Sequence, residues 1–276
     1  MRAHLGGSSR QSLAIARTAL DAAVKGASSA DASQLSSDLF LAADVIGGNI
    51  SLRRAMTDPA RSAADKAQLV KDLFGSHVGQ HAQALLGEIA SQRWSGSKDL
   101  TLVLEQLAVE AEASAANIAN ELDRVEDEFF AASQAVAGNF ELRKALIGPA
   151  DAEAKAALVS QLLSSHTQST QKLVTALVSN LRGRSIESAF DDFTYALAAR
   201  RNRVIAIVRV ANELTSAQRE RLSAALTKQA GQPVRVNIEV DASVVGGVSV
   251  KYADELVDAT VSTRLARAGR ALAGQK

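Results

Sequence analysis

Histidine is the side chain in this sequence with the widest chemical range, and the chain has four, His4, His77, His81 and His166. His77 and His81 are four residues apart and could share a helix face, but no H-E-x-x-H motif or nearby carboxylate triad completes a metal site. His77 and His166 each follow a serine at a predicted helix end, where a positive charge favours the helix dipole. This structural role is favoured over phosphotransfer, which needs an exposed histidine in mid-helix. We expect no catalytic, metal-binding or cofactor-binding residue in the chain.

Carboxylates gather in residues 121–128 and at 191–192, and paired carboxylates can act as general acid and general base. The acidic residues of 121–128 are interleaved, however, with the apolar Leu122, Val125 and Phe129. This spacing is typical of the solvated face of an amphipathic helix, which is the interpretation favoured here.

Two short basic runs, 182–184 and 200–203, lie at predicted helix ends. Complementing the helix dipole is the favoured interpretation, and contact with an acidic partner surface is the alternative. The single tryptophan, Trp94, also lies at a helix end. Covering the helical core is favoured there over anchoring a partner, because one residue without an apolar patch is a weak interface signal.

The composition excludes several classes of protein. The absence of cysteine removes disulfide frameworks, thiolate metal sites and cysteine nucleophiles. A count of 31 Lys and Arg against 30 Asp and Glu leaves a net charge of +1, which argues against a nucleic-acid-binding protein. Neither a Walker loop nor a Gly-x-Gly-x-x-Gly motif is present. The longest aliphatic run is Val204–Val208, whereas a membrane span needs about 18–20 apolar residues, so we expect a cytoplasmic protein without direct membrane insertion.

Apolar residues at three- and four-residue steps predict that most of the chain is helical. The predicted helices are 12–24, 32–46, 49–56, 61–74, 80–94, 156–163 and 173–181. Residues 97–137 keep the same spacing without Gly or Pro. They fit either one long helix, which could be a shared spine for two bundles, or two helices with a break near 114–117.

Part of the helical region occurs twice. Residues 48–60 and 138–150 share Gly, Asn, Leu, Arg, Ala, Pro and Ala in register, and Ser76-His77 matches Ser165-His166 further along. A period this long predicts two copies of a small helical bundle.

After residue 203 the apolar residues alternate with polar ones, which predicts strands. The predicted strands are 204–208, covered on both faces, 234–240, with one solvated face, 248–250 and 255–258. A capping box from Thr215 to Gln218 opens a helix to about 229, the glycines at 246–247 form a turn, and a last helix covers 260–273.

These patterns predict a fold that is mainly α with a small C-terminal α+β domain, in which tandem helical bundles precede a small sheet-and-helix domain. The predicted domains are an N-terminal helical bundle at 1–105, a second helical unit with a long connecting helix at 106–202, and the α+β domain at 203–276.

Residues 231–265 carry a distinctive pattern of strands and short motifs. The motifs are Val240-Asp241, Ser243, Gly246-Gly247, Asp254, Val257-Asp258 and Arg264-Leu265. This pattern resembles the C-terminal signature of the δ subunit of F-type ATP synthase, also called OSCP, here in an extended form with a duplicated helical unit. Ala253 stands where the family often has Gly, and Ala259-Thr260 replaces Gly-Ser. Residues 142–149, Lys155, Phe190 and Tyr195 also resemble the family, so that the resemblance covers about 120–273.

The resemblance implies that Asp241, Gly246, Gly247, Asp258, Arg264 and Leu265 are structural residues of the signature. It also implies a non-catalytic stator subunit without a cofactor. Such a subunit lies on the catalytic head at the cytoplasmic face of the cell membrane, grips the N-terminal helices of α subunits, and binds the end of the b-type peripheral stalk.

Partner helices are expected to dock into apolar grooves between bundle helices. The first and last helices of the N-terminal unit are the expected sites, and the second unit is expected to be a spacer. The expected partner-binding residues are Leu13, Ile15, Leu20, Leu85, Ile89 and Trp94. The alternative function is that of a helical scaffold or adaptor that binds unrelated partners through its duplicated bundles.

Overall fold

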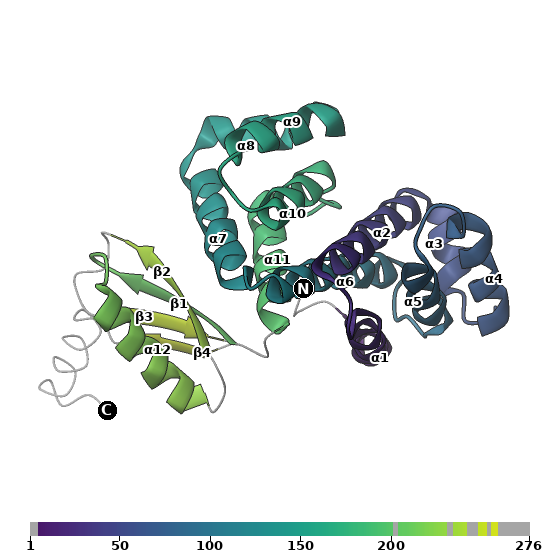
Figure 1. Cartoon of the computed structure of the whole chain (residues 1–276), viewed down its shortest axis with the longest axis horizontal. Coiled ribbons are helices and arrows are strands. Elements are labelled where there is room, and N and C mark those ends of the chain that lie inside the picture. The colour runs from purple at the N-terminus through teal and green to yellow at the C-terminus, as the bar shows by residue number, and fades with distance from the viewer. Residues whose placement is uncertain (1–4, 201–203, 231–233, 242–247, 253–254, 259–276) are drawn as a thin grey trace, which may run out of the picture. The chain divides into compact units, whose positions relative to one another are not determined.

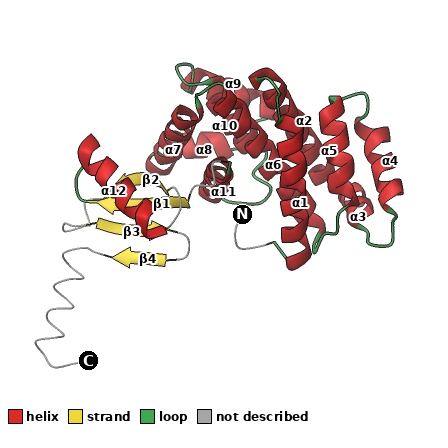
Figure 2. Ribbon diagram, turned by 60° about the horizontal axis from the view of Figure 1, so that its bottom comes forward, coloured by secondary structure: helices red, strands yellow, loops and turns green. Residues whose placement is uncertain are grey.

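The computed structural model describes residues 5–200, 204–230, 234–241, 248–252 and 255–258. The chain divides into two compact units, Met1–Leu197 and Ala198–Lys276. Helices build the first unit, and the described part of the second unit is a four-stranded sheet with one helix (Figures 1 and 2). The predicted fold class is therefore confirmed. The division of the helical region at residue 105 stays a prediction.

The helices of the first unit follow one another with short connections. They are α1 (Gly7–Val24), α2 (Ser29–Gly48), α3 (Ile50–Thr57), α4 (Ala63–Phe74), α5 (Gln80–Ser91), α6 (Ser97–Ile118), α7 (Leu122–Gly138), α8 (Phe140–Ile147), α9 (Ala152–Leu162), α10 (Gln168–Ser179) and α11 (Ile186–Ala199). Helix α1 begins at Gly7 rather than Ser12, because its first residues are held by the α5–α6 connection and by the first turn of α6. Ser9 Oγ donates to Asp99 Oδ2 at 2.6 Å, and Ser12 Oγ donates to the Arg93 carbonyl at 2.6 Å.

Residues 97–137 form two helices, which decides between the two alternatives that the spacing allowed. Between α6 and α7, Asn120 has a φ of 59°, in the left-handed region that asparagine tolerates better than most residues. The N–H groups of Asn120 and Glu121 donate to the Asn117 and Ala116 carbonyls at 3.1 Å and 2.8 Å. These bonds satisfy the last carbonyls of α6 and end the helix a few residues after the predicted break.

Helix α6 belongs to two helical bundles. Six of its residues join the core of the first bundle, α1–α6, namely Leu100, Val103, Leu104, Leu107, Ala108 and Ala111. Val109, Ala113 and Ala116 join the core of the second bundle, α6–α11. Every residue from 103 to 116 is buried, so α6 is enclosed on all sides. A helix of this kind has no solvated face, and its polar side chains must find partners inside the protein.

The two bundles repeat the same local structures. Asn49 caps α3 by accepting the Leu52 N–H at 3.0 Å, and Asn139 caps α8 by accepting the Leu142 N–H at 3.0 Å. Met56 in α3 and Leu146 in α8 are both buried, as are Val70 in α4 and Val159 in α9. Helices α2 to α5 thus correspond in order to α7 to α10, as the sequence repeat suggests.

The second unit contains a mixed sheet of β1 (Val204–Val210), β2 (Val234–Val240), β3 (Val248–Tyr252) and β4 (Glu255–Asp258), with α12 (Ser216–Ala230). The strand order is β2-β1-β3-β4, with β1 parallel to β2 and antiparallel to β3. Ala206, Val208 and Val210 of β1 form a core with residues of α12 and β2. The capping box is present, since Thr215 N–H donates to Gln218 Oε1 at 2.8 Å. On the opposite face of β1, Ile207 is half-buried and Arg209 is exposed, so the expected covering of both faces is partial.

Several sequence predictions fall outside the described residues. They are the glycine turn at 246–247, the helix at 260–273, and the signature residues Arg264 and Leu265.

Candidate functional site

The six residues expected to bind a partner lie on or near α1 and α5, but most of them face inward. Leu13, Leu20, Leu85 and Ile89 belong to the core of the first bundle. Ile15 on α1 is 38% exposed. Trp94, just after α5, is half-buried against the same core, as the structural interpretation of this residue predicted. Binding by any of the six stays a prediction, and Ile15 and Trp94 are the two that a partner can reach in this conformation.

His77, His81 and His166 lie at helix ends rather than in a shared site. The backbone N–H of His77 donates to the Phe74 carbonyl at 2.8 Å, and that of His166 donates to the Leu163 carbonyl at 2.9 Å. These equivalent backbone bonds close α4 and α9, so both histidines lie at the helix ends where the sequence predicted them. Across the described residues, no group of three or more His, Cys, Asp or Glu side chains could hold a metal ion.

The acidic run at the start of α7 is not uniformly solvated, and the prediction for it is wrong at two positions. Glu126 is buried and Glu128 is half-buried, while Glu121, Asp123 and Asp127 are exposed. Glu128 Oε2 accepts hydrogen bonds from the Thr167 N–H and hydroxyl and from the Thr170 hydroxyl, each at 2.8 Å. It thereby caps the start of α10, a contact that periodicity along α7 does not reveal.

Burial raises the pKa of Glu128. The hydrogen bonds from Thr167, Thr170 and Arg124 together lower it by more than burial raises it, so the pKa lies below its ordinary value.

A carboxylate also binds the start of the equivalent helix in the first bundle. Asp38 Oδ2 accepts the Gly79 N–H at 2.8 Å at the start of α5. The side chain four residues earlier supports each carboxylate, Gln34 for Asp38 and Arg124 for Glu128, at 2.8 Å in both cases.

Three buried glutamates on α6 form ion pairs with cations of α1, of α10 and of the turn between α10 and α11. Arg17 Nε of α1 donates to the two carboxylate oxygens of Glu110 at 2.9 Å and 3.1 Å. Lys172 Nζ of α10 lies 2.7 Å from Glu112 Oε2, and Arg182 Nε lies 3.0 Å from Glu105 Oε1. The glutamate side chains are only 1–2% exposed. Burial lowers the pKa of Arg17, but the hydrogen bond and charge of Glu110 raise it above the ordinary value.

Sequence reasoning missed this cluster. The apolar spacing of α6 suggests one buried stripe with solvated glutamates beside it, whereas the helix is enclosed by two bundles. The sequence offers one hint, the basic run at 182–184. Its two arginines lie far along the chain from Glu105 but pair with it in the structure.

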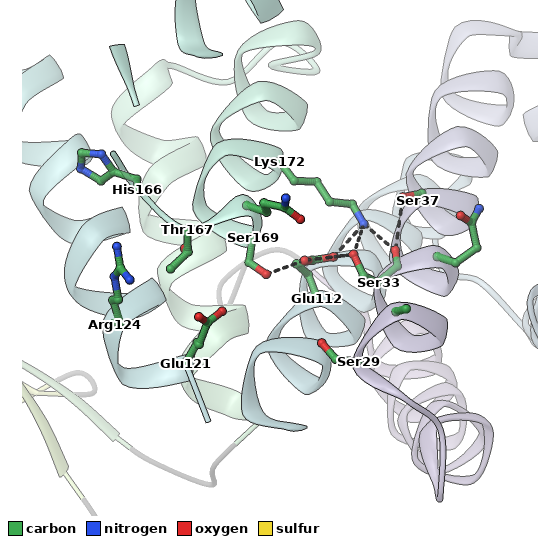
Figure 3. Close-up of a pocket in the computed structure, with 13 residues that line it drawn as sticks. Ser29, Ser33, Ser37, Glu112, Glu121, Arg124, His166, Thr167, Ser169 and Lys172 are labelled. Atoms are coloured by element: carbon green, nitrogen blue, oxygen red, sulfur yellow. Dashed lines mark hydrogen bonds and ion pairs between the residues drawn. The ribbon is translucent and has the colours of Figure 1, made fainter. Parts of the chain in front are cut away.

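A polar cleft of about 990 Å³ lies between the start of α2, the end of α6, and α10 (Figure 3). Lys172 Nζ of α10 donates to Ser33 Oγ of α2 and pairs with Glu112, which lies between them (Figure 3). Ser169 also donates to Glu112, at 2.6 Å. Arg124, Glu121 and His166 line the other end. The charges in the cleft are of both signs and mainly paired, so the cleft resembles an interface between helices more than a site for an ion.

The signature residues within the described sheet have structural positions. The Asp241 N–H donates to the Val210 carbonyl at 2.8 Å, which extends the β1–β2 pairing by one bond. Asp258 pairs with Ser249 at the end of β4. Arg209 and Glu239, which are register partners, form an ion pair of 2.9 Å on the face opposite α12.

Among the residues that the structure describes, no helix has the length and hydrophobicity that a membrane crossing requires.

Residues 109–272 match the model of the family described as the ATP synthase delta (OSCP) subunit. A relative from Streptomyces coelicolor, named ATP synthase subunit delta, is 41% identical over 97% of this chain and 98% of its own length. Relatives of the same name from Streptomyces griseus and Kineococcus radiotolerans are 40% and 38% identical, over 96% and 97% of this chain and 98% of their own lengths. One chain of a solved structure, a cryo-EM structure of the Toxoplasma gondii mitochondrial ATP synthase hexamer, aligns with 59% of this chain and 96% of its own length at 22% identity, with a TM-score of 0.37.

Proposed function

Since the chain belongs to the ATP synthase delta (OSCP) subunit family, we propose that its task within ATP synthase is mechanical. In this proposal it is a non-catalytic stator subunit that links α subunits at the top of the catalytic head to the b-type peripheral stalk, and so resists the torque of the rotor. It is held peripherally at the cytoplasmic face of the cell membrane, through the complex.

The observation that carries the proposal is the division of the chain into two compact units with separate cores. A linking subunit must hold two partners at once, and two independently packed units can each offer a binding surface. We assign the α subunits to the helical unit and the b-type subunit to the α+β unit.

Within the helical unit, we assign the N-terminal helix of an α subunit to the side of the first bundle formed by α1 and α5. The counterpart of this side in the second bundle lies between α6 and α10, where Lys172 bridges α10 to α2 through Ser33 and Glu112. A partner helix would have to break these partly buried contacts to enter. The second bundle therefore acts as a spacer.

A substitution on α1 tests the assignment. Ile15→Asp places a charge on the α1 side of the first bundle without entering the core, since Ile15 is 38% exposed. We expect this variant to bind a peptide of the α-subunit N-terminus at least about tenfold more weakly, the effect of losing about 1.4 kcal/mol. Isothermal titration calorimetry with this peptide, and separately with the soluble part of a b-type subunit, measures both interactions.

Leu41→Asp on α2 is the matched control, because Leu41 is also apolar and 42% exposed. It should leave both affinities unchanged, and Ile15→Asp should leave the b-type affinity unchanged. Equal weakening of α-peptide binding by the two variants would contradict the assignment to α1 and α5. Full coupling of proton flow to ATP synthesis in membranes that lack the chain would contradict the stator function itself.

A further inference from the structure

The turn between α10 and α11 holds Arg182 in an unfavourable backbone conformation. Its φ is 53°, and Gly183 beside it has a φ of 77°. Glycine adopts this left-handed region freely, whereas for a long side chain such as arginine it costs free energy and persists only where the surroundings fix it. The contacts of the Arg182 side chain identify those surroundings.

The guanidinium group of Arg182 reaches out of its own turn to two other helices. Its Nη2 lies 2.6 Å from Asp44 Oδ1 and its Nη1 donates to the Ala43 carbonyl at 3.1 Å, both on α2. Its Nε donates to Glu105 Oε1 on α6 at 3.0 Å. The Arg182 side chain is only 9% exposed. The planar fork of an arginine suits this arrangement, since its three nitrogens point to three separate acceptors.

Helix α2 is shaped to receive this side chain. A Cβ atom on Gly47 would lie 2.6 Å from Arg182 Nη1 and 2.9 Å from a methyl carbon of Thr101, whereas a Cβ atom on Gly48 would meet nothing within 4 Å. Gly47 therefore leaves the space through which the guanidinium passes, and any larger residue there would push it away from Asp44.

Neighbouring contacts support the same junction. Arg184 Nη2 lies 2.7 Å from Glu105 Oε2, so that two arginines share one buried glutamate, and Asn180 Nδ2 donates to Asp44 Oδ1 at 3.1 Å. The α10–α11 turn is thus bound both to α2 and to α6.

We propose that Arg182 is a latch that fixes the second bundle to α2, so that the two bundles move as one rigid body. The two bundles share α6, and they also meet where Lys172 of α10 donates to Ser33 near the start of α2 and where Phe40 of α2 stacks on Phe193 of α11. These contacts leave the end of α2 unattached to the second bundle without Arg182, and there the bundles could twist about α6. The contact of Arg182 with the end of α2, a helix that packs beside α6, opposes this twist. The inference rests on the proposed stator function in one respect, because resistance to torque is what makes this stiffness useful.

The distance between labels on the two bundles tests the latch in the full-length chain. The chain has no cysteine, so single cysteines at exposed Gln11 of α1 and Ser160 of α9 can carry spin labels without other changes. We expect one narrow distance distribution for the otherwise unaltered chain. Arg182→Met should broaden it or add a second distance, and Arg182→Lys should do the same, because one ammonium group cannot serve three divergent acceptors.

A pair of adjacent glycines provides the matched control. Gly47→Ala should broaden the distribution with every charge retained, since the new methyl group displaces Arg182, and Gly48→Ala should leave it narrow. Circular dichroism reports whether each variant is folded, and Gly47→Ala decides the question if Arg182→Met unfolds. An unchanged distribution in folded Gly47→Ala, or equal broadening in Gly48→Ala, would overturn the latch.

A second measurement separates the latch from the stator function. In membranes that contain the assembled ATP synthase, the latch variants should stay bound but reduce the protons pumped per ATP hydrolysed, while Gly48→Ala should not. If deletion of the whole chain leaves pumping unchanged, the stator function fails while the distance measurement still decides on the latch. If the latch variants broaden the distances but pump normally, the latch stands and its link to torque is refuted.

Discussion

Glu128 shows how one carboxylate can connect two helices and make the fold sensitive to acid. It lies on α7 and accepts the N–H and hydroxyl of Thr167 at the start of α10. Burial raises its pKa, but these hydrogen bonds outweigh burial and hold the pKa below the ordinary value of 4.5. A carboxylate with a depressed folded pKa stabilises the fold fully above its unfolded pKa, and this contribution is lost as the pH falls through the folded pKa.

We therefore expect Glu128→Gln to lower the free energy of unfolding by about 1.5–3 kcal/mol at neutral pH, the usual range for hydrogen bonds to a charged group. The difference from the unaltered chain should shrink as the pH falls below 4.5. Urea unfolding followed by circular dichroism between neutral pH and about pH 3 measures this, with exposed Glu88→Gln on α5 as the control. A difference that stays constant over this range would mean that the charge of Glu128 contributes nothing.

At the scale of elements, the sequence predicts most of the helices and strands, although not α11, but predicts their environments poorly. Asn49 and Asn139 before the repeated helices, and the capping box at Thr215, are local signals, and each is present in the structure. The enclosure of α6 depends on contacts with helices of both bundles. In the sequence pattern, Glu110 and Glu112 stand at positions where solvated residues are expected. Only the tertiary structure shows that each is buried and paired with a cation.

Because α6 is enclosed, we expect the loss of one partner of its ion pairs to lower the stability of the fold strongly. Arg17→Met should cost about 3–5 kcal/mol of stability, because it leaves Glu110 buried without its cation. The double variant Arg17→Met with Glu110→Leu should recover most of this loss, since an apolar pair of similar volume avoids the cost of burying charge. Chemical denaturation of the two variants measures the recovery, with exposed Arg10→Met on α1 as the control. A double variant less stable than Arg17→Met would show that the pair itself stabilises α6.

At the scale of the whole molecule, two units with separate cores would allow one chain to hold the two partners that we propose. The change in periodicity near residue 203 predicts the second unit because alternation and helical spacing are visible in the sequence, and the units of the structure meet at Leu197 and Ala198. The sharing of α6 by two bundles could not be predicted in the same way. A shared helix and a connecting helix have the same apolar spacing, and only burial on all sides distinguishes them.

Because the two units have separate cores, we expect one to unfold without the other. Val208 on β1 is fully buried in the core of the second unit, so Val208→Asp should unfold that unit by burying an unpaired charge. The cores of the two helical bundles contain no residue of this sheet, so we expect the variant to keep the thermal transition of the helical unit and its affinity for the α-subunit peptide. It should lose binding to the b-type subunit. Calorimetric titration with each partner and thermal melting by circular dichroism measure these properties. Loss of both affinities in Val208→Asp would contradict the independence of the units, and with it the assignment of one partner to each.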